Sequence, residues 1–395
     1  MTARPGARRA EGAQMTDEFR HGSGVADAAR TVARLAAERA EQAEQARRMD
    51  ADVLRALVGA GFARHFVPAA HGGAAATFTE LAAGITTLGA RCPATAWSAS
   101  IVASLSRMAA YLPEAGRKEV WREGPDTVIV GSVSPVGRAR AVDGGWRVGG
   151  TWPYVSVVDH SDWALVTAPA AAGEGRPLPR LFALPRGAYR TETTWSDVGM
   201  RASGSNTLIA EDVFVADELS FSAQDLLTGR APQGVEGCHA VPLPAVNGLF
   251  FTLPMLGAAQ GALELWSAST APKLASASYT PGPGPGRGFY EETLARCSGE
   301  LDAARLLLER VARVADRGTA PTPLETARAQ RDCALAAEML VRVVDRLFAA
   351  SGTSGHSVNT PLQRLWRDVH SAAGHVVLQL GPAAAAYAGR AAGER

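Results

Sequence analysis

The sequence predicts an α+β protein in which a helical segment, a β-rich segment and a second helical segment follow one another. Apolar residues recur at steps of three and four from Val25 onward, as they do in amphipathic helices. Between 127 and about 219 the pattern changes to short apolar runs separated by Gly and Pro, which is typical of strands. Helical periodicity returns near 294. The expected boundaries are a disordered tail at 1–24, a helical domain at 25–126, a β domain at 127–235 and a helical domain at 236–395.

The first domain is expected to contain four helices. In the first of them, Val25, Ala29, Val32 and Ala36 share one face. Gly61 ends the second helix, because glycine adopts the backbone conformations that close a helix. The other expected helices are 49–60, 77–88 and 95–111.

The β domain is expected to contain a tight hairpin. The strands 139–142 and 146–148 are joined by Asp143-Gly144-Gly145, and Asp-Gly and Gly-Gly supply the positive φ angles that such turns need. Further strands are expected at 163–167, 181–184, 189–193 and 207–215.

The last domain is expected to be a set of packed helices. The apolar residues between 294 and 315 form a seam for antiparallel neighbours. The helix 324–350 is apolar on more than one face, which indicates burial in a bundle or in an oligomer interface. The Pro/Gly repeat at 281–286 cannot form a core.

Composition excludes several classes of function. The net charge is +1, so the chain has no basic field for nucleic acid. No run of apolar residues has the length of a membrane span, and the N-terminal segment lacks the apolar stretch of a secretory signal. The four cysteines show no CxxC spacing, which predicts a reduced cytoplasmic protein with neither disulfides nor a zinc site.

The most informative segment is 130–163, VGSVSPVGRARAVDGGWRVGGTWPYVSVVDHSDW. Its small-residue loop, 131–137, has free backbone N–H groups that can lie against a planar cofactor with polar edges. One strand later, Tyr154 can cover the face of that cofactor and Ser156 can reach a ring atom. The order and length of the pattern distinguish it from an ordinary surface hairpin.

This segment resembles the flavin-binding β domain of the acyl-CoA dehydrogenase superfamily. Its residue pattern is most similar to that of the flavin-dependent monooxygenases of two-component systems. The resemblance extends over roughly 25–390. It implies a helical N-terminal domain, a small β-barrel, a C-terminal four-helix bundle and a homotetramer. It also implies that Ser156 bonds flavin N5. The residues that it places at the cofactor are Ser132, Val133, Ser134, Trp152, Tyr154 and Ser156.

The resemblance also locates what is missing. Acyl-CoA dehydrogenases need a carboxylate base beside the flavin. One family position for that base is Val376 here, and the helix that carries the alternative base contains no Asp or Glu between 246 and 259. On the expected helix 361–377 stand His370 and His375 instead. A neutral imidazole there can hydrogen-bond the oxygen-carrying flavin or take a proton from the substrate.

Two further departures bear on the ligands. The regions that hold the ADP half of FAD in the dehydrogenases read differently at 271–274 and 351–355, which suits a protein that borrows reduced FMN or FAD from a separate reductase. Trp97 and Ser104 are expected at the substrate. Ser104 stands where aromatic hydroxylases of this branch often carry a His, which puts a phenolic substrate in doubt.

These observations predict a cytoplasmic oxygenase component that uses reduced flavin and O₂. It would hydroxylate, or oxygenate at nitrogen or sulfur, a small organic substrate in bacterial natural-product metabolism. Two alternatives remain at this point. One is a dehydrogenase- or oxidase-like flavoenzyme with a non-standard base, and the other is a non-catalytic homologue.

Overall fold

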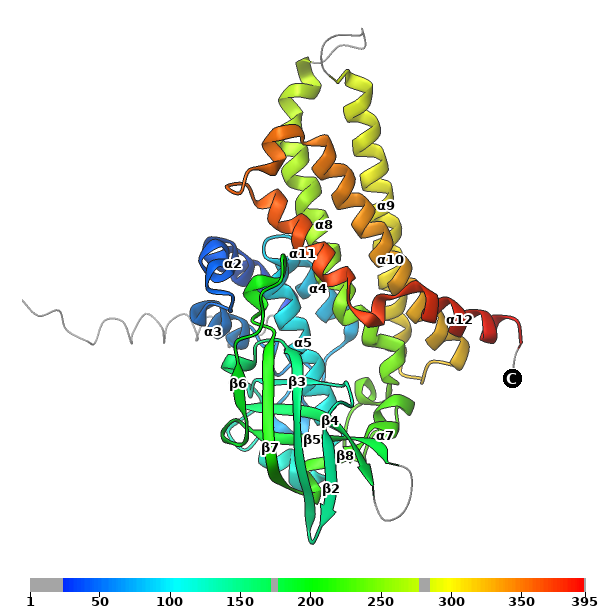
Figure 1. Ribbon diagram of the computed structural model, residues 1–395. Coiled ribbons are helices and arrows are strands. Elements are labelled where there is room, and N and C mark those ends of the chain that lie inside the picture. Colours follow the sequence, from blue (N-terminus) through cyan, green and yellow to red (C-terminus); the bar gives the residue numbers. More distant parts are fainter. Residues whose placement is uncertain (1–23, 172–176, 277–284, 394–395) are drawn as a thin grey trace, which may run out of the picture.

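The computed structural model describes residues 24–171, 177–276 and 285–393. In this part of the chain helices, strands and helices follow one another in the predicted order (Figure 1). Apart from Gly24 the predicted tail lies outside the described residues, and so does most of the Pro/Gly repeat at 281–286.

The N-terminal helices begin and end where local chemistry permits. The side chain of Asp50 accepts hydrogen bonds from two backbone N–H groups at the start of α3, and Thr77 caps α4. Gly61 has a φ of 92°, the left-handed conformation expected after α3. The short helix α6 was not predicted. The helices are α2 (Val25–Ala46), α3 (Ala51–Gly59), α4 (Phe78–Gly89), α5 (Pro93–Ala109) and α6 (Glu114–Val120).

The middle of the chain forms one eight-stranded sheet. Its hydrogen-bonded order is β6-β7-β3-β2-β4-β5-β8, and β1 pairs with β4 in parallel. The two ends of this path are not paired with each other, so the barrel implied by the resemblance is corrected to an open sheet. The strands are β1 (Ile129–Ser132), β2 (Arg138–Val142), β3 (Gly145–Val155), β4 (Trp163–Ala171), β5 (Leu178–Pro185), β6 (Arg190–Glu192), β7 (Asn206–Ala216) and β8 (Ser220–Ser222).

Long helices complete the molecule. The helix α8 contacts α9, α10 and α11, and α10 contacts α9, α11 and α12. Figure 1 shows the sheet at one end, with α8, α9 and α10 extending away from it. The elements are α7 (Ala223–Thr228), α8 (Leu243–Ser276), α9 (Arg287–Ala315), α10 (Pro323–Ala350), α11 (Pro361–Ala373), the 3-10 turn η8 (Val376–Leu378) and α12 (Leu380–Ala391).

The helix α8 is the central element of the fold. It contacts α4 and α5 as well as the C-terminal helices. By length and composition alone, Leu243–Ala275 could cross a membrane, but 83% of its most apolar window is buried inside the protein. That burial is typical of the core helix of a globular domain.

Candidate active site

A bulge in β3 turns Tyr154 outward. The register between β3 and β7 shifts between Trp152 and Val155, and Tyr154 has a φ of 63°, a left-handed conformation that bulky residues rarely adopt. Its side chain is 72% exposed and lies edge-on to Trp195, with ring centroids 6.3 Å apart. Strain of this kind clusters at ligand sites. The aromatic ring that was predicted to cover a planar cofactor is therefore exposed.

The small-residue loop after β1 lies beside this bulge. Ser132 ends β1, and its carbonyl accepts a hydrogen bond from Thr167 Oγ1 at 3.1 Å. Val133 and Ser134 follow, and both are exposed. At the far end of the loop, a Cβ on Gly137 would lie 2.3 Å from the Trp152 indole, so only glycine allows this approach. The loop is thus held against β3 with its predicted cofactor residues uncovered.

Trp152 does not share that exposure. Its side chain is completely buried in the core of the β domain, and its indole N–H donates to the carbonyl of Thr167 at 2.9 Å. The prediction that Trp152 contacts the cofactor is corrected: this residue packs the strand that presents Tyr154 and Ser156.

Ser156 stands at one end of a chain of three hydroxyl groups. Its Oγ accepts the indole N–H of Trp97 at 3.0 Å and lies 2.8 Å from the Oγ of Ser205, which lies 2.7 Å from that of Ser203. A hydroxyl has one hydrogen to donate and two lone pairs. Either hydroxyl can be the donor between Ser156 and Ser205, so after its bonds to Trp97 and Ser205 the Ser156 hydroxyl retains capacity for one further hydrogen bond to a ligand.

Aromatic rings from three elements meet next to Ser156. His375 stacks on Phe251 of α8 with ring centroids 3.8 Å apart, and the Trp97 ring on α5 lies 5.9 Å from His375 and 5.1 Å from Phe251. The site therefore combines the β domain with both helical domains, which explains why its members are distant in the sequence.

The surroundings of His375 determine its protonation. Burial among apolar groups lowers the pKa of His375 to about 4, so the ring is neutral at pH 7. Its Nδ1 accepts the backbone N–H of Val377 at 3.3 Å. The single proton of the neutral ring therefore sits on Nε2, which makes this atom a hydrogen-bond donor.

His375 is not on the helix that was predicted to carry it. The helix α11 ends at Ala373, and His375 is the N-cap of η8. His370 does lie on α11, but its Nε2 bonds Asp345 at 2.8 Å and its ring packs on Trp366. The structure thus assigns His370 to the contact between α10 and α11, and the prediction that it acts beside His375 is corrected.

The predicted substrate residues lie on one helix. Trp97 and Ser104 are two turns apart on α5, and both are buried. The indole N–H of Trp97 donates to Ser156, so Trp97 positions this hydroxyl. That Ser104 contacts the substrate stays a prediction.

A buried carboxyl group fixes the loop that carries Ser203 and Ser205. Asp368 of α11 accepts the backbone N–H of Met200 at 2.6 Å. A Cβ on Gly199 would lie 2.2 Å from the carbonyl of Arg367, so the loop lies directly on α11. The sequence analysis assigned no role to these two serines.

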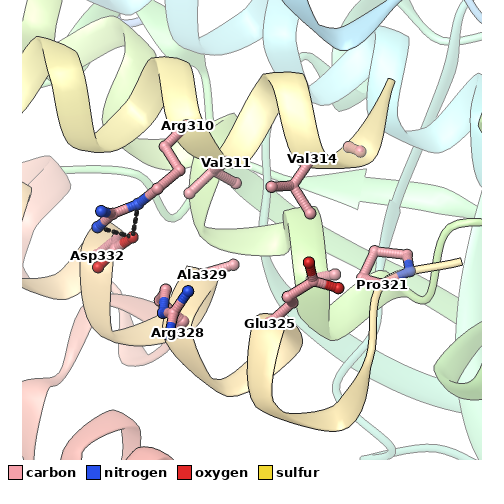
Figure 2. A pocket seen from close by; sticks show the side chains of 10 residues that line it. Arg310, Val311, Val314, Pro321, Glu325, Arg328, Ala329 and Asp332 are labelled. Carbon is pink, nitrogen blue, oxygen red and sulfur yellow. Dashed lines mark hydrogen bonds and ion pairs between the residues drawn. The ribbon is translucent and has the colours of Figure 1, made fainter. Parts of the chain in front are cut away.

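Figure 2 shows a small hollow between α9 and α10 in which Arg310 and Asp332 are joined by hydrogen bonds. Its volume is about 40 Å³, enough for little more than a water molecule. It shares no residue with the group around Ser156 and His375, and it is too small for an organic substrate.

Comparison with known proteins matches this architecture. The acyl-CoA dehydrogenase N-terminal domain model matches residues 23–122, and the acyl-CoA dehydrogenase C-terminal domain model matches 249–380. The oxygenase subunit HsaA of a flavin-dependent monooxygenase from Rhodococcus jostii is 31% identical over 348 residues, which are 86% of this chain and 90% of that protein. The chain therefore belongs to the acyl-CoA dehydrogenase superfamily, in its flavin-dependent monooxygenase branch.

Other relatives place it in the same branch. The oxygenase component of an FADH₂-dependent resorcinol hydroxylase from Rhizobium is 31% identical over 90% of this chain and 88% of its own length. The crystal structure of 3-HSA hydroxylase from Rhodococcus sp. RHA1 superposes with a TM-score of 0.88 at 27% identity, covering 94% of this chain and 97% of that one. The prediction that the chain is a flavin-dependent monooxygenase, an oxidoreductase that uses reduced flavin and O₂, is confirmed.

The residues of the oxygenase fit a reduced flavin. Tyr154 offers an uncovered ring, Ser156 a hydroxyl with capacity for one further hydrogen bond, and His375 a donor on Nε2. Val376, at a family position of the dehydrogenase base, is 74% exposed and carries no carboxylate. The site therefore has hydrogen-bonding groups for oxygenation and lacks the base that α,β-dehydrogenation requires.

Proposed function

We propose that this oxygenase takes reduced FMN or FAD from a separate reductase and inserts one oxygen atom of O₂ into an electron-rich aromatic substrate. The observation that carries the proposal is the convergence of Ser156 from the turn after β3, Trp97 from α5 and His375 from the N-cap of η8. Bound reduced flavin supplies the electrons that activate O₂. The protein binds the ring, excludes water and donates hydrogen bonds.

The role proposed for each residue follows from its exposure and from the hydrogen-bonding capacity that the protein leaves unused. Tyr154 and the residues Ser132, Val133 and Ser134 would support the ring. Ser156 would donate its hydrogen to Ser205 and accept the N5–H of reduced flavin on its remaining lone pair.

His375 would donate from Nε2 to an oxygen atom near the ring. Acting as a base would require it to give up the Nδ1 bond from Val377, so donation is the role that the geometry favours over proton abstraction.

The substrate class is supported by the rings and by the relatives. Trp97 and Phe251 are apolar aromatic neighbours of His375, and the relatives include a p-hydroxyphenylacetate 3-hydroxylase component from Acinetobacter baumannii and an indole-3-acetate monooxygenase from Pseudomonas putida. With Ser104 on α5 in place of a base, a ring that reacts without prior deprotonation is favoured. A role in natural-product metabolism and a cytoplasmic location complete the proposal.

The test is the redox preference of flavin binding. Purified oxygenase is expected to retain little flavin and to bind reduced flavin roughly tenfold or more tightly than the oxidised form, because oxidised N5 has no hydrogen to give Ser156. Anaerobic and aerobic equilibrium dialysis with FMN and FAD measure both affinities. Stoichiometric FAD that survives gel filtration would contradict the proposal.

Removal of the Ser156 hydroxyl should uncouple the reaction. In Ser156→Ala the N5–H loses its acceptor, at a cost of about 0.5–1.5 kcal/mol, so reduced-flavin affinity should fall roughly two- to tenfold and H₂O₂ release should rise. Ser156→Thr keeps the hydroxyl and should stay close to the parent. Equal coupling in the Ala and Thr variants would exclude this contact. Assays of product and H₂O₂ per reduced flavin give the answer.

A homotetramer is proposed together with the domain boundaries 25–126, 127–235 and 236–395. The helix α9 exposes Phe289, Leu294 and Leu306, which a partner subunit would cover. Light scattering is expected to give four times the chain mass of 41.2 kDa. A single chain mass at micromolar concentration would refute the tetramer.

A further inference from the structure

A cleft lies beside η8 and the start of α8. Its volume is about 260 Å³, and it is bounded by α7, the start of α8, α10, η8 and α12. An apolar cavity of roughly 150 Å³ holds a benzene molecule, so this cleft has room for a ring and a substituent.

The cleft adjoins the proposed reacting centre. Val376 and Val377, the two residues that follow His375, form part of its wall. Asn247, another wall residue, precedes Phe251 by one turn of α8 and so lies on the same side of that helix. A molecule in the cleft would therefore extend from the stacked pair of His375 and Phe251.

The wall of the cleft is uncharged, and its polar side chains are all carboxamides. None of the residues that line the cleft carries a charge. Its polar side chains are the three carboxamides of Asn247, Gln330 and Gln379. Among the described residues, none of these side chains hydrogen-bonds to protein, so each carboxamide can both donate to and accept from a ligand.

The cation that follows Gln330 on α10 is already engaged. Arg331 follows Gln330 in the chain, but its guanidinium donates to Asp332 Oδ1 at 2.7 Å and lies over the ring of Tyr387. A carboxylate in the cleft would lose hydration without gaining a counter-charge, which is costly, whereas a neutral polar group would gain hydrogen bonds.

We infer that this cleft binds the part of the substrate remote from the oxygenated carbon, and that this part ends in an uncharged hydrogen-bonding group such as an amide or a hydroxyl. The inference rests on the proposed oxygenase function and deepens it. The substrate class is a neutral, one- or two-ring aromatic compound, and an aromatic carboxylate is rejected.

A matched pair of ligands tests the charge rule. Equilibrium dialysis under anaerobic conditions, with and without reduced FMN, compares 4-hydroxyphenylacetamide with 4-hydroxyphenylacetate. The oxygenase should bind the amide at least about tenfold more tightly. Asn247→Leu should weaken amide binding roughly threefold to tenfold and leave carboxylate binding unchanged. Asn247→Arg should reverse the preference, because it places a cation in the wall.

The control is Gln45→Arg, which adds the same charge on the exposed face of α2. Equal or tighter binding of the carboxylate by the parent protein would overturn the inference. So would binding of neither ligand at millimolar concentration, or the same reversal in Gln45→Arg. Failure to bind reduced FMN in the same dialysis would count against the proposed function instead, and the ligand preference would still be decided by the flavin-free samples.

Discussion

Replacing His375 by Phe is expected to lower the rate of product formation by about 10²–10⁴ while H₂O₂ release rises. Phe keeps a ring to stack on Phe251, where the His375 centroid lies at 3.8 Å, but it has no hydrogen to donate. His375→Ala should show the same loss. Flavin affinity should change little, because Tyr154 and Ser156 are the residues proposed to hold the flavin ring. Product and H₂O₂ are measured per reduced flavin consumed.

Two controls separate donation from packing. His375→Gln places an amide N–H near the former Nε2 and should recover part of the coupling. His370→Ala breaks the bond to Asp345 on the α10–α11 contact and should affect stability but leave coupling normal. Normal coupling in His375→Phe, or loss of coupling in His370→Ala, would show that the assignment is wrong.

The pH dependence adds an independent criterion. Because burial holds the pKa of His375 near 4, its ring stays neutral from pH 6 to 8, and its contribution to coupling should be constant over that range. An inflection near pH 6.5 that disappears in His375→Phe would mean that the imidazole titrates as it does in water.

Local pattern predicted most of the elements but not their exact ends. The helical period of the apolar residues and the capping residues located helices such as 77–88, which the structure gives as Phe78–Gly89. The strand expected at 146–148 extends to Val155, because cross-strand pairing with β7 continues past Gly149 and Gly150, whose lack of side chains hid the alternation. The helix expected at 361–377 ends at Ala373, where Gly374 provides the C-cap. Whether the sheet closes depends on long-range pairing, which short motifs do not encode.

Residues of the candidate site could be proposed from the sequence where a recognisable motif contains them, and they were missed where their surroundings carry no such signal. Tyr154 and Ser156 stand in one recognisable stretch. Phe251 lies in an apolar helix, where it cannot be told from an ordinary core residue until the fold brings it to His375. Ser205 shows its role only through its 2.8 Å contact with Ser156. Trp152 sits in the same motif as Tyr154, but strand alternation and the bulge direct it into the core.

The second large effect concerns Asp368. In Asp368→Ala the buried N–H of Met200 loses its acceptor. We expect a loss of about 1–3 kcal/mol in the free energy of unfolding. Reduced-flavin affinity should fall as well, because the loop with Ser203 and Ser205 is no longer held on α11. Thermal melts and dialysis measure the two effects.

Asp368→Asn should show the opposite sign of stability change, with a defined pH dependence. Burial raises the pKa of Asp368 to about 7, so between about pH 4 and 7 the folded protein holds a proton that the unfolded chain releases. The contribution of this group to stability therefore falls as pH rises through that window. Asn keeps an acceptor for Met200 and never ionises. The variant should equal the parent near pH 4 and exceed it by up to about 4 kcal/mol at pH 8. Parallel stability curves from pH 4 to 8 would mean that Asp368 ionises normally in the fold, and the clamp on Met200 would then be a charged hydrogen bond instead of a neutral one.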